Sequence, residues 1–299
     1  MPSLPYRGRF APSPTGPLHF GSLLAAFGSW LLARHAGGQW CVRLEDIDPP
    51  RAEAGASERQ LRTLAAFGLV SDLPILRQSD RDAHYTAALT TLLETGQAFE
   101  CSCSRADLAR MGGIHHACVA PLGARRAVRL RVPPQPPVGF DDGLQGHVLQ
   151  DVHAEVGDVV LRRADGYWAY QLAVVVDDAA QAITDVVRGA DLLDSTPRQL
   201  VLQRALGLPT PRYLHLPLIL DAEGRKLSKS HAAPALDDGD PLPALRAAWQ
   251  ALGQPPAVLP PHGGVDTLLQ QAVQHFSPEL LPATPTLDLS MRASPPLRD

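Results

Sequence analysis

Two lysines that lie close together in the sequence are the first residues to suggest chemistry. Of the 27 basic residues in the chain, only Lys226 and Lys229 are lysines, and both lie in Arg225-Lys-Leu-Ser-Lys-Ser230. A lysine ammonium is a compact charge on a flexible stem, so it can follow a phosphate during a reaction, whereas arginine imposes a planar fork. The run therefore suggests triphosphate chemistry. The alternative is a solvated turn, since Asp221-Ala-Glu-Gly224 directly before it is typical of a hairpin.

The first third of the chain alternates between strand and helix patterns. Tyr6 to Ala11 and Gln39 to Leu44 have strand patterns, and apolar residues recur at helical spacing from His19 to the glycines of His35-Ala-Gly-Gly38. A strand, a helix and a strand within the first 45 residues predict a parallel sheet with a right-handed crossover. Further helices are expected at residues 56–67, 82–95, 241–252 and 265–275.

The loop after the first strand lies where such a sheet binds its ligand. Open α/β sheets bind ligands beyond the carboxyl ends of their strands. The loop Pro12-Ser-Pro-Thr-Gly-Pro17 leads from that end to a helix amino terminus, whose unpaired N–H groups suit a phosphate. There His19 could donate to a phosphate oxygen, and Gly21 leaves room for a flat base. The alternative for His19 is a helix cap or a surface position.

A group of cysteines and histidines predicts a metal site. Cys101-Ser-Cys103 and Cys118 lie close together, with His115 and His116 between them. Three thiolates and one imidazole are enough for a closed tetrahedral zinc site. We expect Cys101, Cys103, His115 and Cys118 to be the ligands, and a metal-free loop of reduced thiols is the alternative.

Composition narrows the class of protein. No apolar run approaches the roughly 18 residues of a membrane helix, and the amino terminus lacks the pattern of a secretory signal, so we expect a cytoplasmic protein without disulfides. Cys41, inside an expected strand, is predicted to be a small core residue. Because the net charge is -4, any polyanion must bind to a local basic patch rather than to the surface as a whole. Arg125-Arg-Ala-Val-Arg-Leu-Arg131 is one candidate, although we prefer to interpret it as a strand with solvated arginines.

Two of these runs together resemble the signatures of class I aminoacyl-tRNA synthetases. The first is Arg9-Phe-Ala-Pro-Ser-Pro-Thr-Gly-Pro-Leu-His-Phe-Gly21, and Lys226-Leu-Ser-Lys229-Ser follows about 200 residues later. The start of the first run, together with Leu-Glu45-Asp-Ile-Asp48, resembles the glutamyl branch. The resemblance covers residues 6–232. It implies an α/β fold with a Rossmann-like parallel sheet, an inserted zinc-containing subdomain and a short helical C-terminal part.

The resemblance also implies a division of the chain into segments. We expect the two halves of the catalytic domain at 1–96 and 161–232, the inserted subdomain at 97–160, and a short helical region with a tail at 233–299. Glutamyl-tRNA synthetases carry a large anticodon-binding domain in place of that last segment. The chain therefore resembles their truncated paralogues, which place glutamate on the queuosine base in the anticodon of tRNA(Asp).

Carried over residue by residue, the resemblance implies a glutamate pocket. Its members are Arg9, Ala11, Ser13, Glu45, Tyr170 and Arg188. The chemistry agrees, because glutamate has two carboxylates and one ammonium. Arg9 and Arg188 can form forks with carboxylates, and Glu45 can pair with the ammonium.

The resemblance assigns the remaining residues to ATP and to the metal. His19 and Gly21 are implied to bind ATP, Lys229 to reach its phosphates and Lys226 to act beside it, with Mg²⁺ held mostly by ATP itself. Related enzymes have a tyrosine in the zinc site where this chain has His115. The spacing to Cys118 is one residue shorter than theirs, so His116 is the alternative ligand.

The expected reaction is activation of L-glutamate by ATP as glutamyl-adenylate, followed by transfer to tRNA(Asp) that carries queuosine. We expect a monomer. Three alternatives stay open: glutamyl transfer to a tRNA 3′ end, a nucleotidylyltransferase that never meets tRNA, and a binding module that has lost catalysis.

Overall fold

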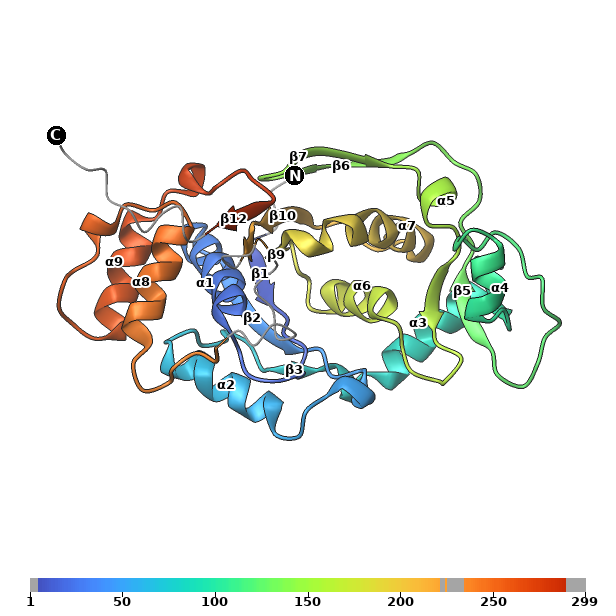
Figure 1. Cartoon of the computed structure of the whole chain (residues 1–299), viewed down its shortest axis with the longest axis horizontal. Coiled ribbons are helices and arrows are strands. Elements are labelled where there is room, and N and C mark those ends of the chain that lie inside the picture. Colours follow the sequence, from blue (N-terminus) through green and yellow to red (C-terminus); the bar gives the residue numbers. More distant parts are fainter. Residues whose placement is uncertain (1–4, 221–223, 225–233, 289–299) are drawn as a thin grey trace.

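A computed structural model of the chain describes residues 5–220, 224 and 234–288 (Figure 1). The predicted site residues Lys226 and Lys229 lie outside the described residues. Among the helices that are described, none combines the length and apolar character that a membrane span requires.

A central sheet of seven strands carries Arg9, the first residue of the first run. Its order is β3-β2-β1-β9-β10-β6-β7. All neighbouring strands are parallel except β6 and β7, which form an antiparallel hairpin at one edge. The strands are β1 (Arg7–Phe10), β2 (Gln39–Leu44), β3 (Leu76–Arg77), β6 (Val138–Asp142), β7 (Gly146–Gln150), β9 (Asp185–Gly189) and β10 (Arg212–Leu216). The predicted parallel sheet is confirmed.

Helices cover both faces of this sheet. Figure 1 shows α8 and α9 beside α1, and α6 beside α7. The helices are α1 (Phe20–His35), α2 (Ala56–Ala66), α3 (Asp82–Glu94), α6 (Tyr170–Ala180), α7 (Thr196–Leu206), α8 (Pro241–Ala251) and α9 (Val265–His275). The four further helices predicted from periodicity are confirmed to within one residue. The short strands β11 (Leu218–Leu220) and β12 (Thr286–Asp288) pair with each other in parallel.

Two apolar cores lie on opposite faces of the sheet, and β2 shows why. Its side chains alternate between the faces, as the pleat requires. Trp40 and Val42 belong to the core that includes α1 and α8, whereas Cys41 belongs to the core of α3, α6 and α7. Cys41 is fully buried, so its prediction as a core residue is confirmed.

A second, antiparallel sheet contributes Cys101 to the cysteine cluster. It consists of β4 (Ala98–Cys101), β5 (Ala127–Leu130) and β8 (Val159–Arg162). Two short helices, α4 (Arg105–Arg110) and α5 (Val152–Glu155), lie in the same part of the chain. The segment expected as an insertion therefore contributes to both sheets, because its hairpin of β6 and β7 extends the central one.

The expectation that the arginines of 125–131 are solvated is wrong for Arg129. This side chain is only 6% exposed and donates to the Asp158 carbonyl oxygen at 3.1 Å. Arg131 lies over the ring of Phe99, with its guanidinium carbon 4.6 Å from the ring centroid. The strand itself is confirmed as β5. The arginines differ because all four residues of β5 are buried, so protein covers both faces of this strand, whereas Arg125, Arg126 and Arg131 lie beyond its ends and are exposed.

Candidate active site

Two cavities open at the carboxyl ends of the parallel strands, as the crevice rule predicts. A cavity of about 530 Å³ lies against the start of α1, between the residues that follow β1 and those that end β9 and β10. A second cavity of about 730 Å³ lies between the residues that follow β2 and the antiparallel sheet. Both are lined by Ser13, Thr15 and Arg51, so the two cavities are adjacent.

His19 and Gly21 both line the smaller cavity. His19 is the N-cap of α1, and its Nδ1 accepts a hydrogen bond from the backbone N–H of Ser22 at 3.3 Å. The capping alternative is therefore correct, yet it does not compete with ligand binding. Because Nδ1 is the acceptor, the neutral ring carries its proton on Nε2, which is the donor that a phosphate oxygen needs.

Arg188, at the end of β9, is a buried cation with neutral partners. The side chain is 5% exposed. Its guanidinium donates to His215 Nε2, Tyr170 Oη, Leu192 O, Thr196 Oγ1 and Gln199 Oε1. Within the described part of the chain, no carboxylate forms an ion pair with it. A buried charge without a counter-charge is costly, so Arg188 is set up to receive an anion.

Arg9, on β1, is in a different state because it is already paired. Its Nε and Nη2 donate to the two carboxylate oxygens of Asp178 at 3.0 and 3.2 Å. The two guanidinium nitrogens that the sequence suggested for a substrate carboxylate therefore already bind the carboxylate of Asp178. Within the described part of the chain, Nη1 is the one guanidinium nitrogen of Arg9 without a hydrogen-bond partner.

Asp178 continues a buried chain of alternating charges. It also accepts from Arg43 Nη1 at 2.7 Å, and Arg43 Nη2 donates to Glu45 at 3.3 Å. Burial alone would raise the pKa of Asp178, but Arg43 and Arg9 hold it below its ordinary value. For Glu45 burial prevails and raises the pKa despite Arg43 and Arg9. An ammonium bound beside Glu45 would favour its ionised form.

Tyr170 interacts with the charged groups of Arg188, Glu45 and Arg9. It is the first residue of α6, it lines the larger cavity together with Ser13 and Glu45, and its hydroxyl accepts from Arg188 Nη1 at 3.2 Å. Burial raises the pKa of Tyr170, and the charges of Arg188, Glu45 and Arg9 all act on it. Ala11 directly follows β1 and is half-buried. The structure thus brings the predicted glutamate residues to one region.

Sequence reasoning missed the residues that hold the predicted arginines. Asp178 pairs with Arg9 and with Arg43, which was not predicted, and His215 and Asp142 form a buried pair behind Arg188. One signal was present: Val174-Val-Val-Asp-Asp178 places two carboxylates in an otherwise apolar stretch. Charges in such a stretch are buried only when they are paired.

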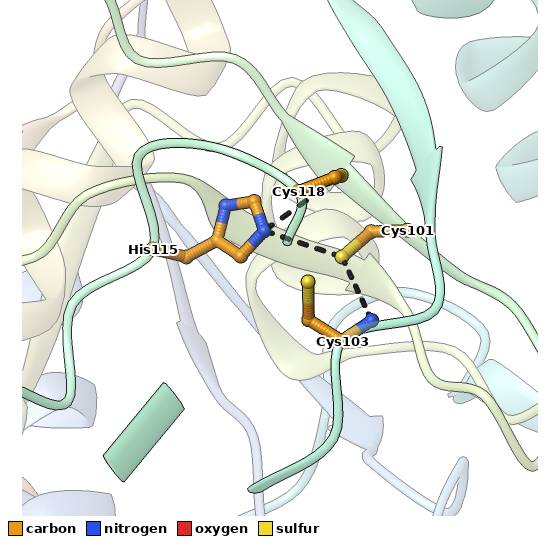
Figure 2. A group of neighbouring side chains, drawn as sticks. All are labelled: Cys101, Cys103, His115 and Cys118. Atoms are coloured by element: carbon orange, nitrogen blue, oxygen red, sulfur yellow. Dashed lines mark hydrogen bonds between the residues drawn. The ribbon is translucent and has the colours of Figure 1, made fainter. Parts of the chain in front are cut away.

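The cysteine cluster gathers the four predicted ligands in one place (Figure 2). One donor atom from each of Cys101, Cys103, His115 and Cys118 lies within 4.8 Å of the others. His115 Nε2 is 3.2 Å from Cys101 Sγ and 3.9 Å from Cys118 Sγ. The alternative ligand His116 instead packs against His153, with ring centroids 4.5 Å apart and the ring planes tilted by 42°.

The donor set fits a metal ion. Desolvation would raise the pKa of Cys103, but the backbone N–H groups of Ala120 and Val119 help to lower it to about 7. Burial and the neighbouring thiols raise the pKa of Cys118 to about 12. Adjacent thiols cannot all ionise without a cation, and a metal ion removes that conflict. His115 Nδ1 lies 2.8 Å from Asp158, which directs Nε2 towards the sulfur atoms, as in carboxylate–histidine–metal groups.

The chain resembles one protein family and several named proteins. The family model of tRNA synthetases class I (E and Q), catalytic domain, matches residues 6–121 and 120–240. Over all 299 residues of both proteins, the chain is 84% identical to the glutamyl-Q tRNA(Asp) synthetase of Xanthomonas axonopodis pv. citri (strain 306). It is 57% identical over 262 residues to the protein of that name from Burkholderia mallei (strain ATCC 23344), covering 83% of this chain and 88% of the other.

The fold of the chain is also found in a solved structure. The glutamate tRNA ligase from Elizabethkingia meningosepticum CCUG26117, solved in complex with its amino acid, has a TM-score of 0.81 at 24% identity. The match covers 97% of this chain and 68% of that one. The expected α/β fold is confirmed.

Proposed function

Because the chain belongs to the family of class I tRNA synthetases for glutamate and glutamine, we propose that it activates L-glutamate with ATP and transfers it to queuosine in tRNA(Asp). The observation that carries the choice of substrate is the buried cation Arg188, whose hydrogen-bond partners among the described residues are all neutral. One of these partners is the hydroxyl of Tyr170, on which the charge of Glu45 also acts. The proposed acceptor is supported by relatives named glutamyl-Q tRNA(Asp) synthetase, one of which matches this chain over its whole length.

The proposed pocket gives each charge of glutamate a partner of opposite sign. Arg188 receives the side-chain carboxylate, and Nη1 of Arg9 receives an oxygen of the α-carboxylate. Glu45 receives the ammonium, which offsets the cost of ionising a buried carboxyl group. Glutamine would leave Arg188 facing a neutral amide, so the same geometry selects against it.

The smaller cavity is the proposed ATP site. His19 Nε2–H and the amino terminus of α1 are donors for the phosphates, and Gly21 lines the cavity wall. Leu218 and Ile219 also line it, and the sequence places Lys226 seven residues after Ile219. We propose that Lys226 and Lys229 serve the phosphates, and that Mg²⁺ enters with ATP, whose oxygens are most of its ligands.

The reaction needs positioning and charge stabilisation more than covalent help. A glutamate α-carboxylate oxygen attacks the α-phosphorus of ATP, the bond to pyrophosphate breaks, and glutamyl-adenylate forms. A hydroxyl of the tRNA acceptor then attacks the activated carbonyl carbon, and AMP leaves with the bonding electrons. Ser13 and Thr15 line both cavities, so they lie where the two substrates meet.

Replacing Lys229 with alanine is expected to slow adenylate formation on the order of 100-fold to 1,000-fold, because it removes a charge that stabilises the departing phosphates. Lys229→Arg should restore only part of the rate, because a planar fork cannot follow the phosphorus. Rapid-quench measurement of glutamyl-adenylate tests both variants. An unchanged rate in Lys229→Ala would contradict the proposed mechanism.

We propose that the cluster of three cysteines and His115 binds one structural zinc ion per chain. His115→Ala should abolish tight zinc binding, whereas the matched variant His116→Ala should leave it unchanged. Asp158→Ala should weaken binding roughly 10-fold to 100-fold, because it orients His115. Metal analysis with a competing chelator measures all three. Equal losses in the two histidine variants would contradict the ligand assignment.

Two acceptors are possible for the same adenylate, and one experiment separates them. Labelled glutamate and ATP are incubated with tRNA(Asp) prepared with and without queuosine, and with tRNA(Glu). The labelled tRNA is then cleaved between its anticodon and its acceptor stem. Label that requires queuosine and stays with the anticodon fragment supports the proposal. Label on the 3′ fragment of tRNA(Glu) would make the chain an ordinary glutamyl ligase, and no label on any tRNA would favour a nucleotidylyltransferase.

A further inference from the structure

A buried row of polar groups lies behind Arg188 and is not explained by the pocket itself. His215, on β10, is fully buried between Asp142 and Arg188. Its Nδ1 lies 2.6 Å from Asp142 Oδ2, and its Nε2 accepts from Arg188 Nε at 3.0 Å. The three residues come from the adjacent strands β6, β10 and β9, and His215 is opposite Arg188 in the strand register.

The hydrogen bonds define the protonation state of His215. The Nε atom of an arginine always carries a hydrogen, so His215 Nε2 must be the acceptor. The proton of the neutral ring is therefore on Nδ1, and it points to Asp142. Burial, together with the positive charge of Arg188, lowers the pKa of His215, although Asp142 opposes the shift. A neutral ring is consistent with this geometry.

Asp142 is itself held in one orientation. Its Oδ1 accepts three backbone hydrogen bonds, from Leu144 at 3.0 Å, Gln145 at 2.9 Å and His215 at 3.1 Å. Its Oδ2 is the atom that faces His215 Nδ1. Burial would raise the pKa of Asp142, but the bonds from His215 and from these backbone groups hold it below its ordinary value.

We propose that Asp142 and His215 are positioning residues for substrate recognition: Asp142 selects the tautomer of His215, and His215 then orients the guanidinium of Arg188. The bond to Nε fixes the plane of the guanidinium, and the bonds at Nη2 fix its rotation. The Nη1 edge is left beside Tyr170, which lines the larger cavity. This inference rests on the proposed function, because it assumes that Arg188 receives a carboxylate of glutamate.

The substitution Asp142→Asn tests the tautomer without removing an atom. The asparagine oxygen must stay with the three backbone N–H groups, so the amide nitrogen faces His215 and donates to Nδ1. The proton of the His215 ring then moves to Nε2, and this N–H group faces the Nε–H group of Arg188. Two donors cannot form a hydrogen bond, so Arg188 loses this support while the volume of the core is unchanged.

Two substitutions of His215 test its contact with Arg188 and its contact with Asp142 one at a time. The side chain of His215→Gln can still present an oxygen to Arg188 Nε, although it no longer binds Asp142 in the same way. The shorter side chain of His215→Asn can keep the contact with Asp142 but cannot reach Arg188. The proposal expects His215→Gln to bind glutamate nearly as well as the wild type, and His215→Asn to resemble Asp142→Asn.

The experiment uses the full chain and three readouts. Nitrogen-15 NMR of histidine-labelled protein reports the ring tautomer, calorimetry reports glutamate and ATP affinity, and thermal unfolding shows that each variant is folded. Asp142→Asn should invert the His215 tautomer and weaken glutamate binding on the order of 10-fold to 100-fold. ATP binding should stay within about twofold.

The outcomes distinguish this inference from the proposed function. An inverted tautomer with unchanged glutamate affinity would overturn the positioning role, as would equal losses for glutamate and ATP, which indicate a general structural defect. A wild-type chain that binds glutamate but forms no adenylate would contradict the proposed function, while weaker binding by Asp142→Asn would still support the inference. A wild-type chain that does not bind glutamate would contradict both.

Discussion

Replacing Arg188 with alanine is expected to lower the efficiency of glutamate activation about 100-fold to 1,000-fold, with little change in the KM for ATP. A buried charge that loses its partner typically costs about 2 to 5 kcal/mol, or about 30-fold to 5,000-fold at about 1.36 kcal/mol per tenfold, and the expected loss lies within these limits. Arg188→Lys should recover little, because an ammonium cannot reproduce the fork that reaches Tyr170 and a substrate carboxylate together. Steady-state kinetics with glutamate and ATP varied separately measure the effect.

Arg212 provides the matched control for Arg188. It lies at the start of the neighbouring strand β10, whereas Arg188 lies near the end of β9, and its side chain is 68% exposed in a pair with Asp185. Exposed ion pairs contribute little, so Arg212→Ala should leave both KM values unchanged. A KM for glutamate that stays within twofold in Arg188→Ala would remove the main support for the proposed pocket.

Replacing Asp178 with alanine is expected to destabilise the fold by about 3 to 5 kcal/mol. The substitution leaves Arg9 and Arg43 as two buried guanidiniums without their shared carboxylate, which is the costly way to break a buried ion pair. Chemical denaturation at neutral pH gives the difference in the free energy of unfolding. Glu58→Ala, which removes an exposed partner of Arg77, should have no measurable effect.

The same carboxylate predicts how stability depends on pH. The pKa of Asp178 is lower in the folded chain than its unfolded value of about 3.9. A carboxyl group whose pKa is lowered by folding contributes its full stabilisation when the pH is above its pKa in the unfolded chain. This contribution is lost as the pH falls through its pKa in the folded chain. The difference in stability between the wild type and Asp178→Ala should therefore be constant above about pH 5 and shrink in more acidic solution. A difference that stays constant down to pH 2 would contradict the assigned ion pairs.

Local patterns in the sequence determined the elements and the kinds of chemistry. The helix α1 was predictable because its apolar residues repeat at helical spacing and glycines follow it, and β2 because it is a short apolar run between loops. The cysteine cluster was predictable because thiol and imidazole ligands need only be near each other in a loop. In each case the relevant residues are neighbours in the chain.

Tertiary structure decided which of these side chains remain available. Arg9 and Asp178 lie 169 residues apart, and nothing local in either segment shows that the carboxylate occupies the fork of that arginine. The choice of His115 over His116 depends on Asp158, 43 residues later, and the burial of Arg129 depends on the sheet around β5. Hydrogen-bond partners are set by packing between distant segments, and packing carries no local periodicity. The sequence therefore determined which residues are candidates for catalysis, whereas the tertiary structure decided that Arg188, rather than Arg9, has no carboxylate partner in the described part of the chain.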